Sequence, residues 1–147
     1  MTDIPCRITI NGQTFDLRYF DSIEIEKNLH NVDGSEHIVN FLSHWVDEND
    51  YVKVKTSGST GQPKLIRALK KHMLCSARHT NSRFGLNSTS TALLCLPATY
   101  IAGQMMIVRA ITSGMNLIVE SARGNIADRL RSAVDFAAMV PNQVFNC

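Results

Sequence analysis

Carboxylates are missing from nearly half of this 147-residue chain. No Asp or Glu occurs between residues 51 and 119, although that stretch carries nine Lys and Arg residues, while the first fifty residues hold ten acidic groups against three basic ones. Charges of both signs normally intermix on a protein surface. The separation therefore predicts a positive surface that attracts an anion, either nucleic acid or a phosphorylated small molecule. The alternative is that the acidic first third folds over the basic middle and neutralises it.

Paired cysteines and a leader segment are also lacking. The four cysteines form no CxxC pair, and residues 1–5 have neither a basic start nor an apolar run. This argues against a zinc ribbon, a disulfide framework and secretion, and it predicts reduced thiols in a cytoplasmic protein. The uncharged stretch 85–108 contains a proline and several polar residues, which a membrane-spanning helix rarely holds together. We expect no membrane partner.

The first part of the chain predicts a hairpin, a helix and a second hairpin. Residues 6–10 and 14–18 alternate around Asn11-Gly12, a pair that favours a tight turn. The apolar residues of 35–48 recur on one helical face. A strand is then expected near 51–54, a polar glycine loop at 56–64, and a short strand at 65–68 that pairs back. A helix is expected at 70–84.

The rest of the chain predicts an α/β fold with a mostly parallel sheet covered by helices. Apolar runs without alternation suggest buried parallel strands at 91–96, 116–119 and 136–140, with helices at 101–113 and 126–132 on the two faces. Residues 1–50 would form an acidic lead-in and 51–147 the main α/β portion. The last seven residues look like the start of another helix, so we expect an incomplete N-terminal domain of a larger enzyme. An uncovered sheet edge would also favour a homo-oligomer.

The segment Thr56-Ser-Gly-Ser-Thr-Gly-Gln-Pro-Lys64 is the most informative part of the sequence. Two glycines let the backbone turn tightly and bring its N–H groups close to an anion, hydroxyls add donors, and the lysine adds a positive charge. Together they suit the oxygens of a polyphosphate. The segment is not a Walker A loop, which ends Gly-Lys-Ser or Gly-Lys-Thr. The alternative is an ordinary surface turn, since Gly, Ser, Thr and Pro are common turn residues.

This segment resembles the phosphate loop of adenylate-forming enzymes, the superfamily of acyl-CoA synthetases, luciferases and peptide synthetases. Every position of that family's motif matches, although Leu65 stands where members usually carry glycine. A second landmark of the family, a proline followed by an aromatic residue and a glycine before a buried helix, corresponds to Pro97, Tyr100 and Gly103. The resemblance spans about residues 50–145, and within the superfamily it is strongest to the o-succinylbenzoate–CoA ligases of menaquinone synthesis.

The resemblance implies an ATP-dependent ligase that adenylates a carboxylic acid and transfers the acyl group to CoA. Such an enzyme would hold the β and γ phosphates of ATP in the loop; the residues are Thr56, Ser57, Gly58, Ser59, Thr60, Gly61 and Lys64. The glutamate that holds Mg²⁺ in the family, the hinge and the C-terminal domain would all follow residue 147. We therefore expect no catalytic residue and no metal ligand in these 147 residues, and no turnover by them alone.

Three further residues are expected at a substrate site. By resemblance, Tyr100 and Gly103 would lie beside the acyl group, although Tyr100 could equally be a core tyrosine with a backbone partner. Arg109 is the only charge in an apolar helix, and burying it unpaired is costly. Its partner would be an acid group of the substrate, or else Glu120 or a carboxylate from the first fifty residues.

Two other classes of function compete with the ligase. A nucleic-acid-binding module would use the basic stretch, but such modules interleave aromatic residues with basic ones, and residues 54–82 contain no aromatic residue other than His72 and His79. A non-catalytic, anion-binding interaction domain would keep the glycine loop as a simple turn. Titration with nucleotide and with single-stranded DNA separates the three.

Overall fold

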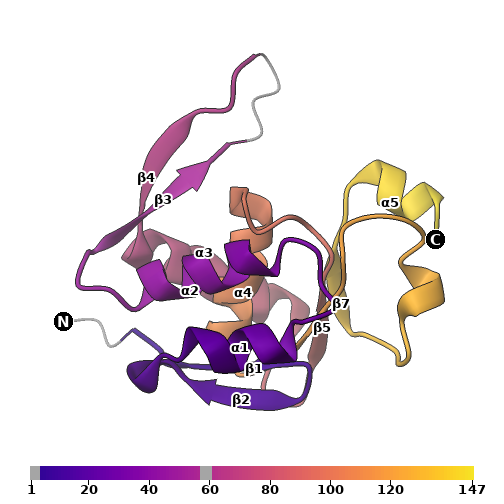
Figure 1. Ribbon diagram of the computed structural model, residues 1–147, viewed down its shortest axis with the longest axis horizontal. Helices are drawn as coiled ribbons and strands as arrows, with labels where there is room; N and C mark the ends of the chain where they lie inside the picture. The colour runs from indigo at the N-terminus through magenta and orange to yellow at the C-terminus, as the bar shows by residue number, and fades with distance from the viewer. Residues whose placement is uncertain (1–3, 57–60) are drawn as a thin grey trace.

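Five strands form the main sheet, in the order β2-β1-β6-β5-β7 (Figure 1). The computed structural model describes residues 4–56 and 61–147. β1 pairs antiparallel with β2, whereas the pairs β1–β6, β6–β5 and β5–β7 are all parallel. The strands are β1 Arg7–Ile10, β2 Gln13–Asp16, β5 Thr91–Leu94, β6 Asn116–Val119 and β7 Phe136–Ala138. The expected α/β fold, with a mostly parallel sheet and an N-terminal hairpin, is confirmed.

The turn between β1 and β2 ties the first hairpin to the parallel part of the sheet. Asn11 and Gly12 have φ angles of 48° and 81°, as the tight turn predicted from Asn-Gly requires. The amide of Asn11 donates to the carbonyl of Leu117 at 3.0 Å, and its side-chain oxygen accepts from the amide of Val119 at 3.0 Å. One turn residue therefore fixes the hairpin against β6.

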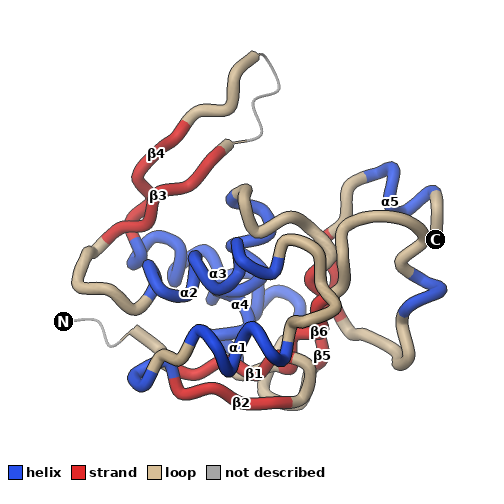
Figure 2. The backbone as a smooth tube through the Cα atoms, viewed as in Figure 1, coloured by secondary structure: helices blue, strands red, loops and turns tan. Residues whose placement is uncertain are grey.

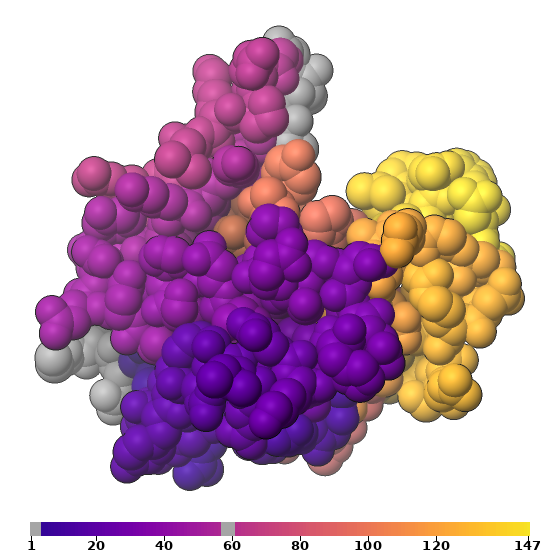
Figure 3. Space-filling model, in the orientation of Figure 1, coloured from indigo at the N-terminus to yellow at the C-terminus, as the bar shows by residue number. Residues whose placement is uncertain are grey.

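A second, two-stranded sheet stands out from the body of the molecule (Figures 1 and 3). β3 (Tyr51–Lys55) and β4 (Leu65–Leu69) are antiparallel over their whole length, from Tyr51 opposite Leu69 to Lys55 opposite Leu65. The strand expected at 65–68 does pair back. The glycine loop is therefore the connection at the far end of this hairpin.

Helix α4 is the centre of the packing. The helices are α1 Ser22–Asn28, α2 Ser35–Trp45, α3 Lys70–Phe84, α4 Ile101–Ser113 and α5 Pro141–Phe145. α4 contacts β1, β5 and β6 on one side and α3 on the other (Figure 2). Its side chains are buried nearly all round, as the apolar sequence predicts. Gly114 ends the helix in the left-handed conformation, with φ 75°.

The other face of the sheet is covered differently from the prediction. Leu93 and Cys95 pack there against Ile126, with Leu130 at the edge of the cluster. The helix predicted over 126–132 is wrong, because the structure has only a 3₁₀ turn, Ala127–Arg129. This segment has no apolar stripe long enough to bury, so tertiary contacts of single side chains hold it instead of a helix.

Helix α1 was not anticipated from the sequence. The Asp21 carboxylate caps it and accepts from the amides of Ile23 at 2.9 Å and Glu24 at 3.3 Å. Asp21 followed three residues later by Glu24 is a signal typical of a helix start. The apolar pattern is too short to reveal the helix, because only Ile25 is buried.

The acidic lead-in and the basic portion share one hydrophobic core. Ile8, Leu42 and Trp45 belong to the same buried cluster as Met106 and Leu117. Within the part of the chain that the structure describes, however, a single ion pair joins the first fifty residues to residues 51–119, and it connects Asp47 with Lys70. Among the described residues, the acidic third therefore packs on the basic portion and neutralises only one of its charges by an ion pair.

Lys70 is almost fully buried, with an exposed fraction of 1%. Its Nζ donates at 3.0 Å both to the Asp47 carboxylate and to the Asp47 carbonyl. Burial by itself would raise the pKa of Asp47, but hydrogen bonds from Lys70 and Asn49 outweigh it and the pKa lies below its ordinary value.

No helix among residues 4–56 and 61–147 is both long and apolar enough to cross a bilayer.

Replacing Lys70 by methionine tests this ion pair. Lys70→Met should lower the free energy of unfolding by about 1–3 kcal/mol, because the Asp47 carboxylate and carbonyl lose their donor while the carboxylate keeps some access to water. Asp47 has a depressed pKa, so its contribution is present at neutral pH and is lost as the pH falls through the folded-state value. The variant should therefore lose less stability than the wild type on acidification. Urea unfolding at pH 7 and below measures both effects, and the exposed control Lys71→Met should change stability by less than about 0.5 kcal/mol.

Gly103 offers a second test of the packing of α4. A Cβ at this position would lie 2.4 Å from the carbonyl oxygen of Pro97, a backbone atom that has little room to move. Gly103→Ala should therefore destabilise the fold by about 1–3 kcal/mol. Ala102→Ser, on the exposed side of the same turn, is the matched control, and equal thermal midpoints for the two variants would contradict the close approach.

Candidate functional site

The ends of the glycine loop are held together at the top of the second hairpin. The amide of Thr56 donates to the carbonyl of Lys64 at 3.0 Å, and the amide of Lys64 donates to the Thr56 hydroxyl at 3.4 Å. Gly61 has φ 149°, a conformation that favours glycine, and Lys64 is exposed. The other predicted loop residues, Ser57, Gly58, Ser59 and Thr60, lie outside the described residues.

The base of this loop lies beside the start of α4. Lys55, the last residue of β3, forms an isolated parallel bridge with Tyr100, and Tyr100 is the N-cap residue of α4. Tyr100 is half-buried, and its amide donates to the carbonyl of Pro97 at 3.3 Å. Gly103 packs against the same proline. The structure thus brings Thr56 into one region with Tyr100 and Gly103, which are more than forty residues away in sequence.

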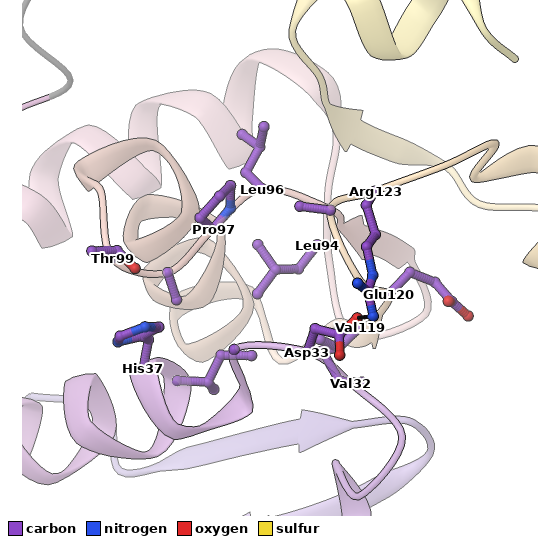
Figure 4. Close-up of a pocket in the computed structure, with 14 residues that line it drawn as sticks. Val32, Asp33, His37, Leu94, Leu96, Pro97, Thr99, Val119, Glu120 and Arg123 are labelled. Carbon is purple, nitrogen blue, oxygen red and sulfur yellow. Dashed lines mark ion pairs between the residues drawn. The ribbon is translucent and has the colours of Figure 1, made fainter.

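A cavity of about 330 Å³ opens at the carboxyl ends of β5 and β6 (Figure 4). After β5 the chain enters α4 on one face of the sheet, and after β6 it crosses the opposite face toward β7. Connections that leave in opposite directions open a crevice at the strand ends, which is where α/β sheets commonly bind ligands. Leu94, Leu96 and Val119 line it, so its floor is apolar.

The lead-in closes one side of this cavity. Residues 32–34 and helix α2 face the strand ends, and Asp33 pairs with Arg123 at 2.5 Å (Figure 4). Both partners are largely exposed, so the pair contributes at most about 1 kcal/mol to stability. The amide of Asp33 also donates to the Ser121 hydroxyl at 3.0 Å. No sequence signal pointed to Asp33 or Arg123, because their proximity depends on how the lead-in folds.

A second cavity, of about 300 Å³, shares a wall with the first. His37, Ala98 and Thr99 line both. The second cavity continues between α2 and the hairpin, where Lys55 and Leu65 mark the base of the glycine loop. The described base of the loop therefore borders a cavity that shares three lining residues with the cavity at the ends of the parallel strands.

Arg109 is a half-buried cation. Its Nη1 lies 3.3 Å from the sulfur of Met106, and its Nε is buried with no hydrogen-bond partner among the described residues. Burial lowers the pKa of Arg109. The alternative in which Glu120 pairs with it is wrong, because the Glu120 carboxylate is bound by Arg129 at 3.1 Å. Arg109 lines neither of the two cavities.

The remaining titratable groups do not form a reactive centre. Burial raises the pKa of the Cys95 thiol to about 11, with a further contribution from Cys147, so it stays protonated at neutral pH. Within residues 4–56 and 61–147, no three His, Cys, Asp or Glu side chains come together as a metal site.

Comparisons with known proteins point in one direction. No family model matches the chain. It is 36% identical over 62 residues to the 2-succinylbenzoate–CoA ligase of Enterococcus faecalis, an alignment that covers 42% of this chain and 13% of that protein. An AMP-forming acyl-CoA synthetase-like protein from Dyadobacter fermentans superposes with a TM-score of 0.70 and 34% identity, over 78% of this chain and 33% of the other.

Two further solved structures share the fold. An Escherichia coli MenE variant with bound OSB-AMS has a TM-score of 0.55 and 26% identity, over 63% of this chain and 20% of that chain. The o-succinylbenzoate CoA synthetase from Bacillus subtilis, in complex with the acyl-adenylate OSB-AMP, has a TM-score of 0.56 at 20% identity, over 86% of this chain and 42% of that one. In sequence and in fold, the chain thus resembles a part of the AMP-forming acyl-CoA synthetases, o-succinylbenzoate–CoA ligases among them.

Proposed function

We propose that this chain is the nucleotide-loop portion of a cytoplasmic ATP-dependent ligase that adenylates a carboxylic acid and passes the acyl group to CoA. The bridge between Lys55 and Tyr100 carries the proposal, because it joins the base of the glycine loop to the region where the parallel strands end. The chain spans only a minor share of each relative that it matches, so the activity belongs to the proposal.

The loop would hold the terminal phosphates of ATP. Its backbone amides, hydroxyls and the Lys64 ammonium supply donors and positive charge, and residues 51–119 contain no carboxylate that would repel a polyphosphate. Phosphoryl chemistry depends mainly on such positioning and charge neutralisation. Thr56, Gly61 and Lys64 are the described members of this set, and Ser57, Gly58, Ser59 and Thr60 complete it.

Mg²⁺ does not fit the described donor set. Mg²⁺ prefers carboxylate oxygens together with substrate phosphates, and residues 51–119 carry no carboxylate. The described residues of the loop therefore suit the phosphates themselves and not a metal ion.

The acid substrate would lie along the start of α4. Tyr100 and Gly103 border the region of the loop, and Arg109 offers a half-buried positive charge whose Nε lacks a hydrogen-bond partner among the described residues. Arg109 is nine residues beyond Tyr100, which on a helix is about 13 Å, and it lines neither cavity. The proposal therefore requires the acid to extend along α4 beyond the cavities, with a second carboxylate, as in o-succinylbenzoate, neutralising this charge.

Lys64→Ala tests the nucleotide loop. The variant should bind ATP and pyrophosphate at least tenfold more weakly than the wild type, a loss of about 1.4 kcal/mol or more, because the ammonium that neutralises the phosphates is gone. Isothermal titration calorimetry on the 147-residue chain measures the affinity, with Lys71→Ala as the control of equal charge. Salt-sensitive binding of single-stranded DNA, with no binding of ATP, would favour the nucleic-acid alternative instead.

Arg109→Met tests the proposed acid site. Removing a half-buried cation without a described carboxylate partner should leave stability unchanged or raise it by less than about 1 kcal/mol, since the partial desolvation cost disappears. Binding of o-succinylbenzoate should weaken at least tenfold, while binding of pyrophosphate should stay the same. Arg83→Met, on α3, serves as the control. A large loss of stability with unchanged acid binding would assign Arg109 a purely structural role.

A further inference from the structure

The second cavity forms a groove between helix α2 and strand β3, here called the α2–β3 groove. α2 supplies His37, Asn40 and His44, and β3 supplies Lys53 and Lys55. These elements contact each other directly. The groove borders the proposed nucleotide site at Lys55, but most of its wall comes from the lead-in helix, to which neither the sequence nor the comparisons assign a role.

Cationic side chains form the β3 wall. Lys53 and Lys55 alternate with the buried Val52 and Val54, so both lie on the exposed face of the strand. Neither lysine has an ion-pair partner within the described part of the chain, and no carboxylate lines the groove there. Two lysines that are two residues apart on one face of a strand can attract a single oxyanion together.

The helix wall adds hydrogen-bonding groups at matched positions. His37, Asn40 and His44 occur at i, i+3 and i+7, which places them on one face of α2. Nδ1 of His44 donates to the carbonyl of Asn40 at 2.8 Å, so Nε2 of the neutral ring is an acceptor for a ligand N–H or O–H. His37 lies 3.5 Å from the Glu36 carboxylate, so His44 is the more available of the two histidines.

The floor of the groove holds a polar atom that lacks a partner. Gln104 is 6% exposed, and its Nε2 donates to the carbonyl of Ala98 at 3.0 Å. Its Oε1 is buried with no hydrogen-bond partner among the described residues. A buried acceptor without a donor costs about 1–3 kcal/mol. A ligand N–H or O–H at this point would recover that energy.

We propose that the α2–β3 groove is a binding site for an organic anion that carries an N–H or O–H group close to its carboxylate or phosphate. The oxyanion lies between Lys53 and Lys55, and the donor reaches Oε1 of Gln104. The apolar part of the ligand covers Phe41 and Ala98 on the floor. This site is additional to the glycine loop and does not require a nucleotide.

Binding of small anionic probes to the full 147-residue chain tests the groove. NMR chemical-shift titration at low salt measures the affinity of each probe. Hippurate carries a carboxylate and an amide N–H, and 4-phenylbutanoate is a matched carboxylate without the N–H. Glycerol 3-phosphate and propyl phosphate, which lacks the hydroxyl groups, form the corresponding phosphate pair. In at least one pair, the probe with the donor should bind at least fivefold more tightly, and that pair identifies the oxyanion. Equal affinities within both pairs, or no binding of any probe, would overturn the proposal.

Variants locate the site. Lys53→Ala with Lys55→Ala should weaken binding of the preferred probe at least tenfold, whereas Lys71→Ala with Arg78→Ala, two exposed positions of α3 and the same change of charge, should alter it less than twofold. Gln104→Leu should remove the preference within the pair, and Gln104→Glu, which keeps an acceptor, should retain part of it. If the Lys53/Lys55 and the Lys71/Arg78 double variants lose the same amount of affinity, net charge alone attracts the probe. That result would contradict a site in the groove.

Competition separates this groove from the nucleotide loop. Saturating pyrophosphate should leave the affinity for the preferred probe unchanged, since the two anions occupy different residues. Displacement of the probe by pyrophosphate would place both in one site and overturn the proposal. Binding of the probe without any binding of pyrophosphate would support the groove and count against the proposed ligase function alone.

Discussion

The close approach of α4 to the turn after β5 is the constraint on which the site depends. Gly103 lies so near the carbonyl of Pro97 that no side chain fits between them, and the helix is then buried against the sheet and α3. This contact sets where the helix begins, and so it sets the position of Tyr100. Tyr100 in turn meets the end of β3, which carries the glycine loop. A local packing requirement therefore decides the distance between the loop and the strand ends.

The separation of charge along the chain has a structural consequence. The acidic lead-in shares the core with the basic portion, yet the described ion pairs join them only through Asp47 and Lys70. The positive charges of the remaining basic residues are not neutralised by the described part of the lead-in, because hydrophobic burial and not charge pairing holds the lead-in in place. A protein that retains uncompensated positive charge near a glycine loop is suited to anionic ligands, as the proposed nucleotide site and the α2–β3 groove both require.

The motif resemblance to adenylate-forming enzymes begins near residue 50 and does not include the lead-in. Residues 32–38 nevertheless close one side of the cavity at the strand ends, and one of them, His37, also lines the second cavity. The lead-in is thereby part of the wall of the candidate site. The groups that the lead-in contributes differ in charge and hydrogen bonding from those of the strands. Because they line the same cavities, the lead-in should affect which ligands bind.

Periodicity and motif spacing were sufficient to predict most elements, the Asn11-Gly12 turn, the hairpin around the glycine loop and the burial of α4, because local backbone preference and apolar pattern decide these features. They were insufficient for α1, for the 3₁₀ turn at Ala127–Arg129 and for the partner of Glu120, where capping and single side-chain contacts decide. Only the tertiary structure revealed the burial of Lys70, the bridge from Lys55 to Tyr100 and the unpartnered oxygen of Gln104. These depend on how residues distant in sequence pack together, and a linear pattern of residue types carries no record of that packing.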